Sequence, residues 1–244
     1  MAYYRSQKTK GDLMNSLKDY KNDLTYWEEL VLKGDLIYPN EHVVRFIFKN
    51  KFKSALDFGC ATGRHLECLN RAGVKKIIGV DINQKPLDVA FARLNERVEM
   101  GGGKLILLNN KDKSLKDILY DTLGDTKVDA IISWGVLHLF TPNIVVNLLS
   151  EFKNHLNKNG KILVNFRSKN DSLKNGAINL EPNVYKITRK SHKDLLYTFY
   201  DIDMIKDVFY KADLKISSID KETFTQNNGD IQNDFYITEA IHNS

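Results

Sequence analysis

The sequence predicts an α/β fold in which a mostly parallel sheet is flanked by helices. Short apolar runs, which are typical of buried strands, alternate with stretches whose apolar residues recur at helical spacing. A glycine-containing turn at residues 59–63 follows the first of these runs and opens a helix. With 244 residues, of which 42% are hydrophobic, the chain is long enough for one such domain with additions.

The segment before the first strand is expected to be helical. Apolar residues recur at helical spacing from about residue 12 to 32, and this stripe includes Tyr26 and Trp27. Residues 38–41 then predict the start of a short helix. We therefore expect residues 1–50 to be largely helical and to precede a domain of residues 51–244.

Strands and helices are expected to alternate through the rest of the chain. The five strands expected to run parallel are 54–58, 75–80, 104–108, 128–134 and 161–166. The helices expected between them are 62–72, a segment from about Pro86 to residue 100, a segment ending near 122, and 142–155. An insertion with a hairpin is expected at 168–198, followed by a helix at 201–212 and two β-rich runs at 214–224 and 233–241.

The turn after the first strand has the features of a nucleoside-cofactor site. Asp57 stands two residues before Gly59, and the second strand is followed by another acid, Asp81. Glycine lets a backbone approach a ligand closely, and free amides at a helix start attract anionic groups. A carboxylate at the end of the neighbouring strand suits a ribose diol. The alternative is that the glycines only shape a tight turn and that Asp81 caps a helix.

Two other nucleotide-binding motifs do not fit this turn. A dinucleotide fingerprint has glycines at its first, third and sixth positions, which here hold Gly59, Ala61 and Arg64. A phosphate-binding P-loop requires Gly-Lys-Ser/Thr after the loop, and this sequence lacks it.

The pattern from Asp57 to Gly63 resembles motif I of the class I S-adenosylmethionine (SAM) methyltransferases, acid-x-Gly-x-Gly-x-Gly, with Ala61 in place of the middle glycine. The resemblance extends over about residues 24–241. Its further matches are residues 79–81, 133–138, 159–161 and the Tyr-Pro-x-Glu stretch at 38–41. It implies a Rossmann-like, seven-stranded sheet of order 3-2-1-4-5-7-6, with residues 1–50 as an N-terminal helical lid. The alternative for Trp27 is ordinary core packing.

The same resemblance implies SAM as cofactor and S-adenosyl-L-homocysteine (SAH) as product. The residues that match its cofactor-binding positions are Asp57, Gly59, Cys60, Ala61, Gly63, Asp81, Ile82, Asn110 and Trp134. Asp57 would support the turn or the methionine amino group, and Asp81 with Ile82 would flank ribose and adenine. A solvent-facing loop is the alternative for Asn110, and core packing is the alternative for Trp134.

On the acceptor side, His138 and Arg167 are the candidate catalytic residues. His138 falls where many family members place a histidine, as base or substrate contact; helix packing is the alternative. Arg167 ends the fifth strand, and a guanidinium fork suits phosphate or carboxylate; a surface arginine is the alternative. Tyr38, His192 and Tyr197 are candidate substrate contacts. The basic run at 189–193 could instead be a solvated face.

These residues predict transfer of a methyl group to an oxygen of a small, anionic metabolite, phosphorylated or carboxylated. Such an oxygen needs no general base. A suspected resemblance to capsule-associated phosphoramidate O-methyltransferases implies a surface-polysaccharide precursor. One alternative is a nucleic-acid methyltransferase, although residues 133–136 lack the Asn/Asp-Pro-Pro-Tyr pattern. The other is a SAM-binding, non-catalytic partner subunit, against which Asp57 and Asp81 argue.

Composition restricts the setting and the partners. Cys60 and Cys68 lie eight residues apart without a CxxC pattern, which predicts neither a disulfide framework nor a metal site and fits a cytoplasmic protein. No secretory leader or membrane-spanning apolar run is evident. The net charge of +5 is modest and dispersed, so we expect neither a nucleic-acid nor a membrane partner. A monomer and a homodimer both remain open.

Overall fold

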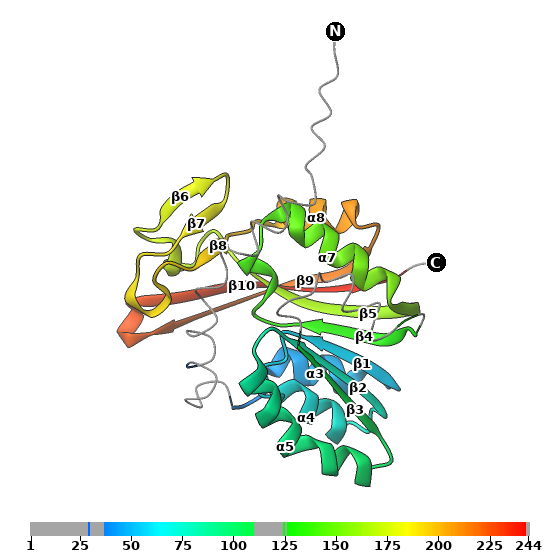
Figure 1. Cartoon of the computed structure of the whole chain (residues 1–244). Helices are drawn as coiled ribbons and strands as arrows, with labels where there is room; N and C mark the ends of the chain where they lie inside the picture. The colour runs from blue at the N-terminus through cyan, green and yellow to red at the C-terminus, as the bar shows by residue number, and fades with distance from the viewer. Residues whose placement is uncertain (1–28, 30–36, 110–123, 125, 243–244) are drawn as a thin grey trace.

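The structure is a computed structural model that describes residues 29, 37–109, 124 and 126–242. Seven strands form one sheet in the order β3-β2-β1-β4-β5-β10-β9 (Figure 1). Their bounds are β1 Ser54–Phe58, β2 Lys76–Asp81, β3 Lys104–Asn109, β4 Val128–Ser133, β5 Leu156–Arg167, β9 Lys215–Gln226 and β10 Ile231–Ile241. The first five are parallel, and β10 is antiparallel to both β5 and β9. This is the predicted order 3-2-1-4-5-7-6.

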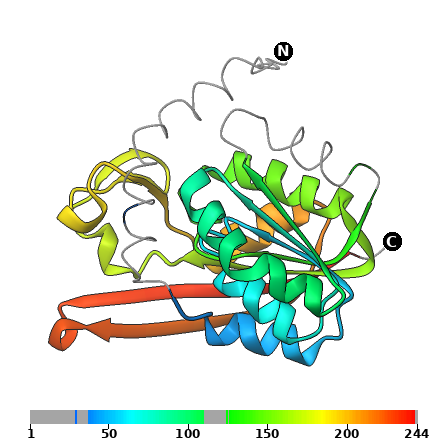
Figure 2. The same cartoon turned by 60° about the horizontal axis from the view of Figure 1, so that its bottom comes forward.

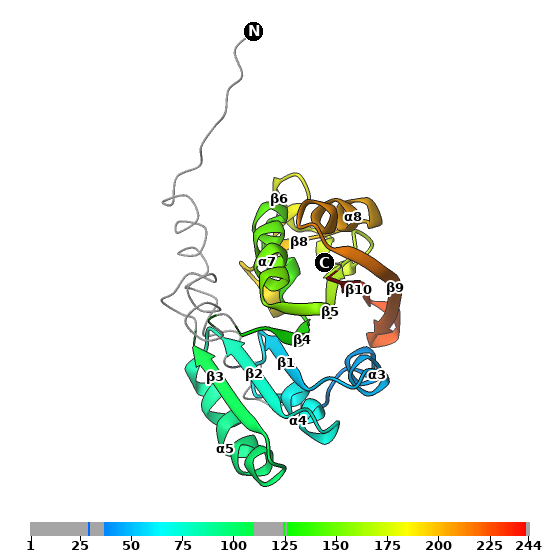
Figure 3. The ribbon, with the colours of Figure 1, turned by 90° about the vertical axis from the view of Figure 1, so that its right-hand side faces the viewer.

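Helices cover both faces of the sheet (Figure 3). Their bounds are α3 Glu41–Lys49, α4 Arg64–Arg71 and α5 Gln84–Met100 on one face, and α7 Pro142–Asn154 and α8 Ile202–Lys211 on the other. Alternate residues of a strand face opposite sides. In β1, Ala55 therefore packs in the core with α3, α4 and α5, whereas Leu56 and Phe58 pack in the core with α7 and α8.

Most element boundaries match the predicted ones within one or two residues. The helix expected to start near Pro86 begins earlier, at Gln84, so the proline occupies the third helical position. The turn at Asn159-Gly160 lies inside β5, where Asn159 has a φ of 61°. The helices expected at 12–32 and before residue 122 fall outside the described residues. In the part of the chain that the structure describes, no helix combines the length and apolarity needed to cross a membrane.

The insertion differs from the single hairpin that was expected. It forms a separate three-stranded antiparallel sheet with β6 Ile178–Glu181, β7 Val184–Lys186 and β8 Leu196–Thr198. It also has its own buried cluster, whose members are Leu173, Ile187, Leu195, Tyr197 and Phe199. These apolar residues explain why the insertion folds as a compact unit and is not a solvated loop.

The two ends of the insertion lie side by side. The amide of Tyr200 donates to the carbonyl of Arg167 at 2.8 Å, and the amide of Lys169 donates to the carbonyl of Tyr200 at 3.0 Å. The β9–β10 hairpin projects past the helices and carries the insertion along its length (Figure 2). The insertion is fixed there by the amide of Gln232, which donates to Ser172 Oγ at 3.0 Å, and by the amide of Asp234, which donates to Asp171 Oδ2 at 3.0 Å.

Candidate functional site

The turn that leaves β1 places three residues in left-handed backbone conformations. Gly59, Ala61 and Gly63 have φ angles of 80°, 48° and 81°. The amides of Gly59 and Cys60 both donate to the carbonyl of Val80, at 2.8 and 3.1 Å, so the turn folds back onto the end of β2. Left-handed backbone favours glycine because a side chain crowds the following carbonyl. The alternating glycine positions of the motif are therefore a conformational requirement.

Both glycines of the turn are also required by packing. A Cβ atom on Gly59 would lie 2.3 Å from Val136 Cγ2. A Cβ atom on Gly63 would lie 2.9 Å from Leu94 Cδ1 and 3.1 Å from Ala90 Cβ, both on α5. Gly63 thus allows the start of α4 to approach α5 closely.

Asp81 holds this turn from the end of β2. Its Oδ2 accepts the amide of Ala61 and its Oδ1 accepts the amide of Asn83, each at 2.9 Å. Burial raises the pKa of Asp81, while the amide hydrogen bonds lower it, and the net shift is upward. Because each carboxylate oxygen can accept more than one hydrogen bond, Asp81 retains the capacity to bind a pair of ribose hydroxyls.

Asp57 is a buried acid whose hydrogen-bonding capacity is unused. Its side chain is fully buried at the end of β1, and neither carboxylate oxygen has a hydrogen-bond partner among the residues that the structure describes. A basic residue, His65, lies close to it, with Nδ1 3.6 Å from Asp57 Oδ2. A buried carboxylate normally has a hydrogen-bonding or cationic partner. An ammonium group, such as that of the methionine part of SAM, would supply one, so these residues fit the cofactor.

Cys60 contributes its backbone to the turn and its side chain to packing. The thiol is buried, and burial, followed by the charges of Asp81 and Asp57, raises its pKa well above the ordinary value. It lies against Gly79 of β2: a Cβ atom there would be 2.7 Å from Cys60 Sγ and 2.8 Å from both Leu107 Cδ2 and Leu66 Cδ1. Sequence reasoning assigned Gly79 no packing role, since the contact joins three separate elements.

The turn after β2 is fixed from β3. Asn109 Nδ2 donates to the carbonyl of Ile82 at 3.1 Å, which holds the backbone on which Ile82 would flank an adenine ring. Sequence reasoning chose the next residue, Asn110, which lies outside the described residues. The signal that could have found Asn109 is its position as the last residue of a strand, where side chains face the ligand edge of a parallel sheet.

Trp134, directly after β4, is half-buried and packs in the core that contains α3, α4 and α5. Its ring is stacked on His42 of α3, with ring centroids 6.1 Å apart. The next residue, Gly135, has a φ of 81°, and its amide donates to Asn165 Oδ1 at 2.6 Å. The buried Asn165 of β5 therefore fixes the turn that leads to His138, a function that sequence reasoning missed.

His138 lies in a short 3₁₀ helix, Leu137–Leu139, and is 3% exposed. Its ring is stacked on Tyr197 of the insertion, with centroids 5.4 Å apart, and lies 6.3 Å from the ring of Phe235. Burial, and then the charge of Arg167, lower its pKa well below 6.5. His138 is therefore neutral at pH 7.

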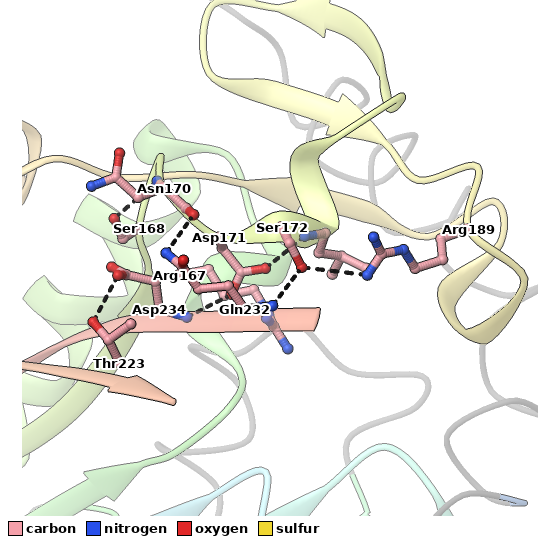
Figure 4. Close-up of polar contacts among 10 residues, drawn as sticks. Arg167, Ser168, Asn170, Asp171, Ser172, Arg189, Thr223, Gln232 and Asp234 are labelled. Atoms are coloured by element: carbon pink, nitrogen blue, oxygen red, sulfur yellow. Dashed lines mark hydrogen bonds and ion pairs between the residues drawn. The ribbon is translucent and has the colours of Figure 1, made fainter. Parts of the chain in front are cut away.

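Arg167 is buried between aromatic rings. Its side chain is 11% exposed, and Nη1 contacts Asp171 Oδ2 at 2.5 Å (Figure 4). The guanidinium carbon lies 4.7 Å from the ring centroid of Phe235 and 5.5 Å from that of Tyr197, distances at which cations and rings attract. Its Nε is buried without a hydrogen-bond partner.

His192 and Arg189 extend this group into the insertion. Burial and then the charges of Arg167 and Arg189 lower the pKa of His192 to about 4. Arg189 Nη1 donates to Ser172 Oγ at 3.4 Å (Figure 4). We call Arg167, Arg189, His138 and His192 the cationic cluster. It holds two guanidinium charges and two neutral imidazoles, with Asp171 as the carboxylate paired to Arg167.

The structure thus brings together four of the residues expected on the acceptor side: His138, Arg167, His192 and Tyr197. Tyr38 lies elsewhere. Arg64 Nη1 donates to its carbonyl at 3.1 Å, which places Tyr38 beside the first turn of α4, with 81% of the residue exposed. Among the described residues, no group of three or more His, Cys, Asp or Glu side chains is arranged to hold a metal ion.

Comparisons with known proteins agree with this geometry. Residues 55–160 match the family model described as a methyltransferase domain. No curated protein matches the sequence significantly.

Among solved structures, a SAM-dependent methyltransferase from Methanosarcina mazei is similar at a TM-score of 0.64 and 13% identity, over 84% of this chain and 99% of that one. The 1,6-didemethyltoxoflavin-N1-methyltransferase of Burkholderia thailandensis, solved with its substrate and SAH bound, is similar at a TM-score of 0.64 and 14% identity, over 100% and 95%. A SAM-dependent methyltransferase from Clostridium acetobutylicum is similar at 0.58 and 14%, over 97% and 100%. At these identities the likeness concerns the fold.

Proposed function

We propose that this chain transfers a methyl group from SAM to an oxygen of a small, anionic metabolite. The match of residues 55–160 to a methyltransferase domain and the strand order of the sheet support a SAM-dependent methyltransferase. The observation that carries the choice of acceptor is the cationic cluster, in which Arg167 stands beside two histidines that are neutral at pH 7. A phosphorylated precursor of a surface polysaccharide is the first acceptor to test.

The ends of β1 and β2 would bind the methyl donor. SAM supplies a methyl group already activated by a sulfonium. Asp81 would hold the ribose, the turn of residues 59–63 would lie along the methionine part, and Asp57 would receive the ammonium. Correct placement of donor and acceptor accounts for about 7–11 kcal/mol of barrier reduction in the most favourable systems.

The acceptor side favours an oxygen that already carries negative charge. A general base works best when its pKa lies near the working pH. Burial, and then the charge of Arg167, hold the pKa of His138 well below 6.5, so this histidine is a weak base, and the charge of Arg167 also attracts an anion. A phosphate or carboxylate oxygen is nucleophilic without losing a proton, and Arg189 and His192 lie where they could bind it.

The donor assignment is tested by titrating SAH into the protein by calorimetry. We expect binding in the wild type, loss of binding in Asp81→Ala, and unchanged binding in Asp220→Ala, which removes an exposed carboxylate from β9. Incubation with methyl-labelled SAM and a metabolite extract should then label an acidic compound. Binding of SAH without any label transfer would favour the partner-subunit alternative, and binding of a nicotinamide dinucleotide in its place would exclude the proposal.

The acceptor assignment is tested at Arg189, because removal of Arg167 would also leave Asp171 unpaired. Arg189→Gln should raise the KM for the labelled acceptor about tenfold, the effect of losing one charged hydrogen bond, without changing the affinity for SAH. Lys193→Gln, an exposed neighbour, is the control. An equal response of both variants, or methylation of a nitrogen in a neutral compound, would contradict the assignment.

A further inference from the structure

His65 connects the buried acid of β1 to the segment that precedes α3. It lies in the first turn of α4, directly after the cofactor turn, and is 4% exposed. One ring nitrogen, Nδ1, faces Asp57 Oδ2 at 3.6 Å. The other, Nε2, accepts the backbone amide of Asn40 at 3.5 Å. No residue role had been predicted for His65 from the sequence.

The contact with Asn40 determines the tautomer of the ring. A neutral imidazole has one N–H donor and one acceptor nitrogen. Because Nε2 accepts an amide proton, the ring proton is on Nδ1, the nitrogen that faces Asp57. At 3.6 Å this contact is longer than a hydrogen bond, so it orients the carboxylate electrostatically and leaves both of its oxygens open for a ligand.

The segment that provides this amide is itself fixed. Asn40 caps α3 by accepting the amide of His42 at 2.8 Å. Arg64, adjacent to His65, donates to the carbonyl of Tyr38 at 3.1 Å. Two neighbouring residues of α4 therefore hold residues 38–40, and these in turn hold the ring of His65. The amide of Asn40 is not free to rotate away, so the orientation of His65 is set before any ligand binds.

We propose that His65 is a positioning residue that directs Asp57 toward the ammonium group of the cofactor. The proposal rests on SAM binding as proposed above. Asp57 is fully buried without a hydrogen bond of its own, so nothing else on the described elements fixes its rotamer except packing and the charge of Arg64. The Nδ1–H dipole of His65 points from α4 toward the Asp57 carboxylate and pre-organises this carboxylate for a cation. Pre-organisation raises the affinity for the ligand.

The alternative is that His65 only fills space between α4 and β1. The two roles differ in which part of the ligand they affect. A residue that acts through Asp57 affects ligands that carry the amino-acid group. A residue that only packs affects every ligand of the site equally, because the loss is one of fold or of turn geometry.

The test uses two probes, SAH and 5′-methylthioadenosine, which keeps the adenosyl part and lacks the amino-acid group. His65→Leu should weaken SAH binding about tenfold and change binding of 5′-methylthioadenosine less than about twofold. His65→Asn, whose amide can donate toward Asp57, should recover most of the loss. In an Asp57→Asn background, His65→Leu should cause no further loss. His155→Leu, which changes a buried histidine at the C-terminal end of α7 on the other face of the sheet, controls for general destabilisation.

Equal weakening of both probes in His65→Leu would assign His65 a packing role and overturn the proposal. No weakening of either probe would overturn it as well. A wild-type protein that binds neither probe would refute the proposed function itself, a result distinct from either of these.

Discussion

The backbone amide of Ala61 donates to Asp81 Oδ2 across 2.9 Å, so the turn after β1 and the acid that ends β2 form one connected unit. The amides of Gly59 and Cys60 add two further bonds to the same strand end. The surfaces proposed for the methionine and ribose parts of the cofactor are therefore fixed relative to each other in the folded protein.

Ala61 stores conformational strain that a glycine would remove. Its φ of 48° lies in the left-handed region, which costs a residue with a Cβ about 1–2 kcal/mol. Ala61→Gly relieves this strain but increases the freedom of the unfolded chain, which offsets about 0.4–1 kcal/mol. We expect the free energy of unfolding to rise by roughly 0.5 kcal/mol in urea titrations. Ala92→Gly, on an exposed helical position of α5, should lower it by about 1 kcal/mol; a similar loss in both variants would contradict the strain.

Gly79→Ala should destabilise the protein by about 1–3 kcal/mol, the usual cost of overpacking. The added methyl group would lie 2.7 Å from Cys60 Sγ and 2.8 Å from two leucine methyl groups. Thermal unfolding measures the effect. The double variant Gly79→Ala/Cys60→Ala should recover part of the stability, since it removes the closest of the three atoms. Additive losses in the double variant would show that the thiol is not the obstacle.

The ion pair between Arg167 and Asp171 should matter more than any exposed pair. The Asp171 carboxylate accepts hydrogen bonds from Arg167, from the amide of Asp234 and from the amide of Leu173. Its side chain is 1% exposed. Asp171→Asn leaves a buried guanidinium without its counter-charge, which costs about 3–5 kcal/mol. Asp203→Asn breaks an exposed pair with Lys206 and should cost less than about 1 kcal/mol. Equal unfolding midpoints in denaturant for the two variants would refute this ranking.

Stability should fall on mild acidification because of His192. Its pKa is about 4 in the folded protein, against an ordinary value of 6.5. Between these values the unfolded chain binds a proton that the folded chain does not, so the stability present above pH 6.5 is lost as the pH falls toward 4. Unfolding free energies across this range should decline less steeply in His192→Gln than in the wild type. Parallel curves would show that His192 titrates normally.

Local patterns predicted the strands of the sheet and the tight turn that follows the first of them. The first strand and the turn of residues 59–63 could be predicted because apolar runs indicate local burial and glycines indicate local backbone conformation. The packing of Gly79 could not be identified in this way, since its reason is a thiol on one element and leucines on two others.

The proposed acceptor side depends on contacts between distant segments. Arg167 lies opposite Phe235 in the register of β5 and β10, 68 residues along the chain, and its second ring, Tyr197, comes from the insertion. The sequence marked Arg167 as a candidate but did not indicate the rings that enclose it. For the insertion, the sequence predicted a hairpin. It did not indicate the buried cluster around Tyr197 and Phe199, because the residues of this cluster come from several short segments and form no periodic apolar pattern within one element.

The two ends of the insertion meet where it leaves the sheet, because the amide of Tyr200 donates to the carbonyl of Arg167. An insertion whose two ends are adjacent can be replaced by one of different length without any change in the path of the strands. Replacement of residues 169–199 would therefore leave unchanged the strand ends that are proposed to hold the methyl donor.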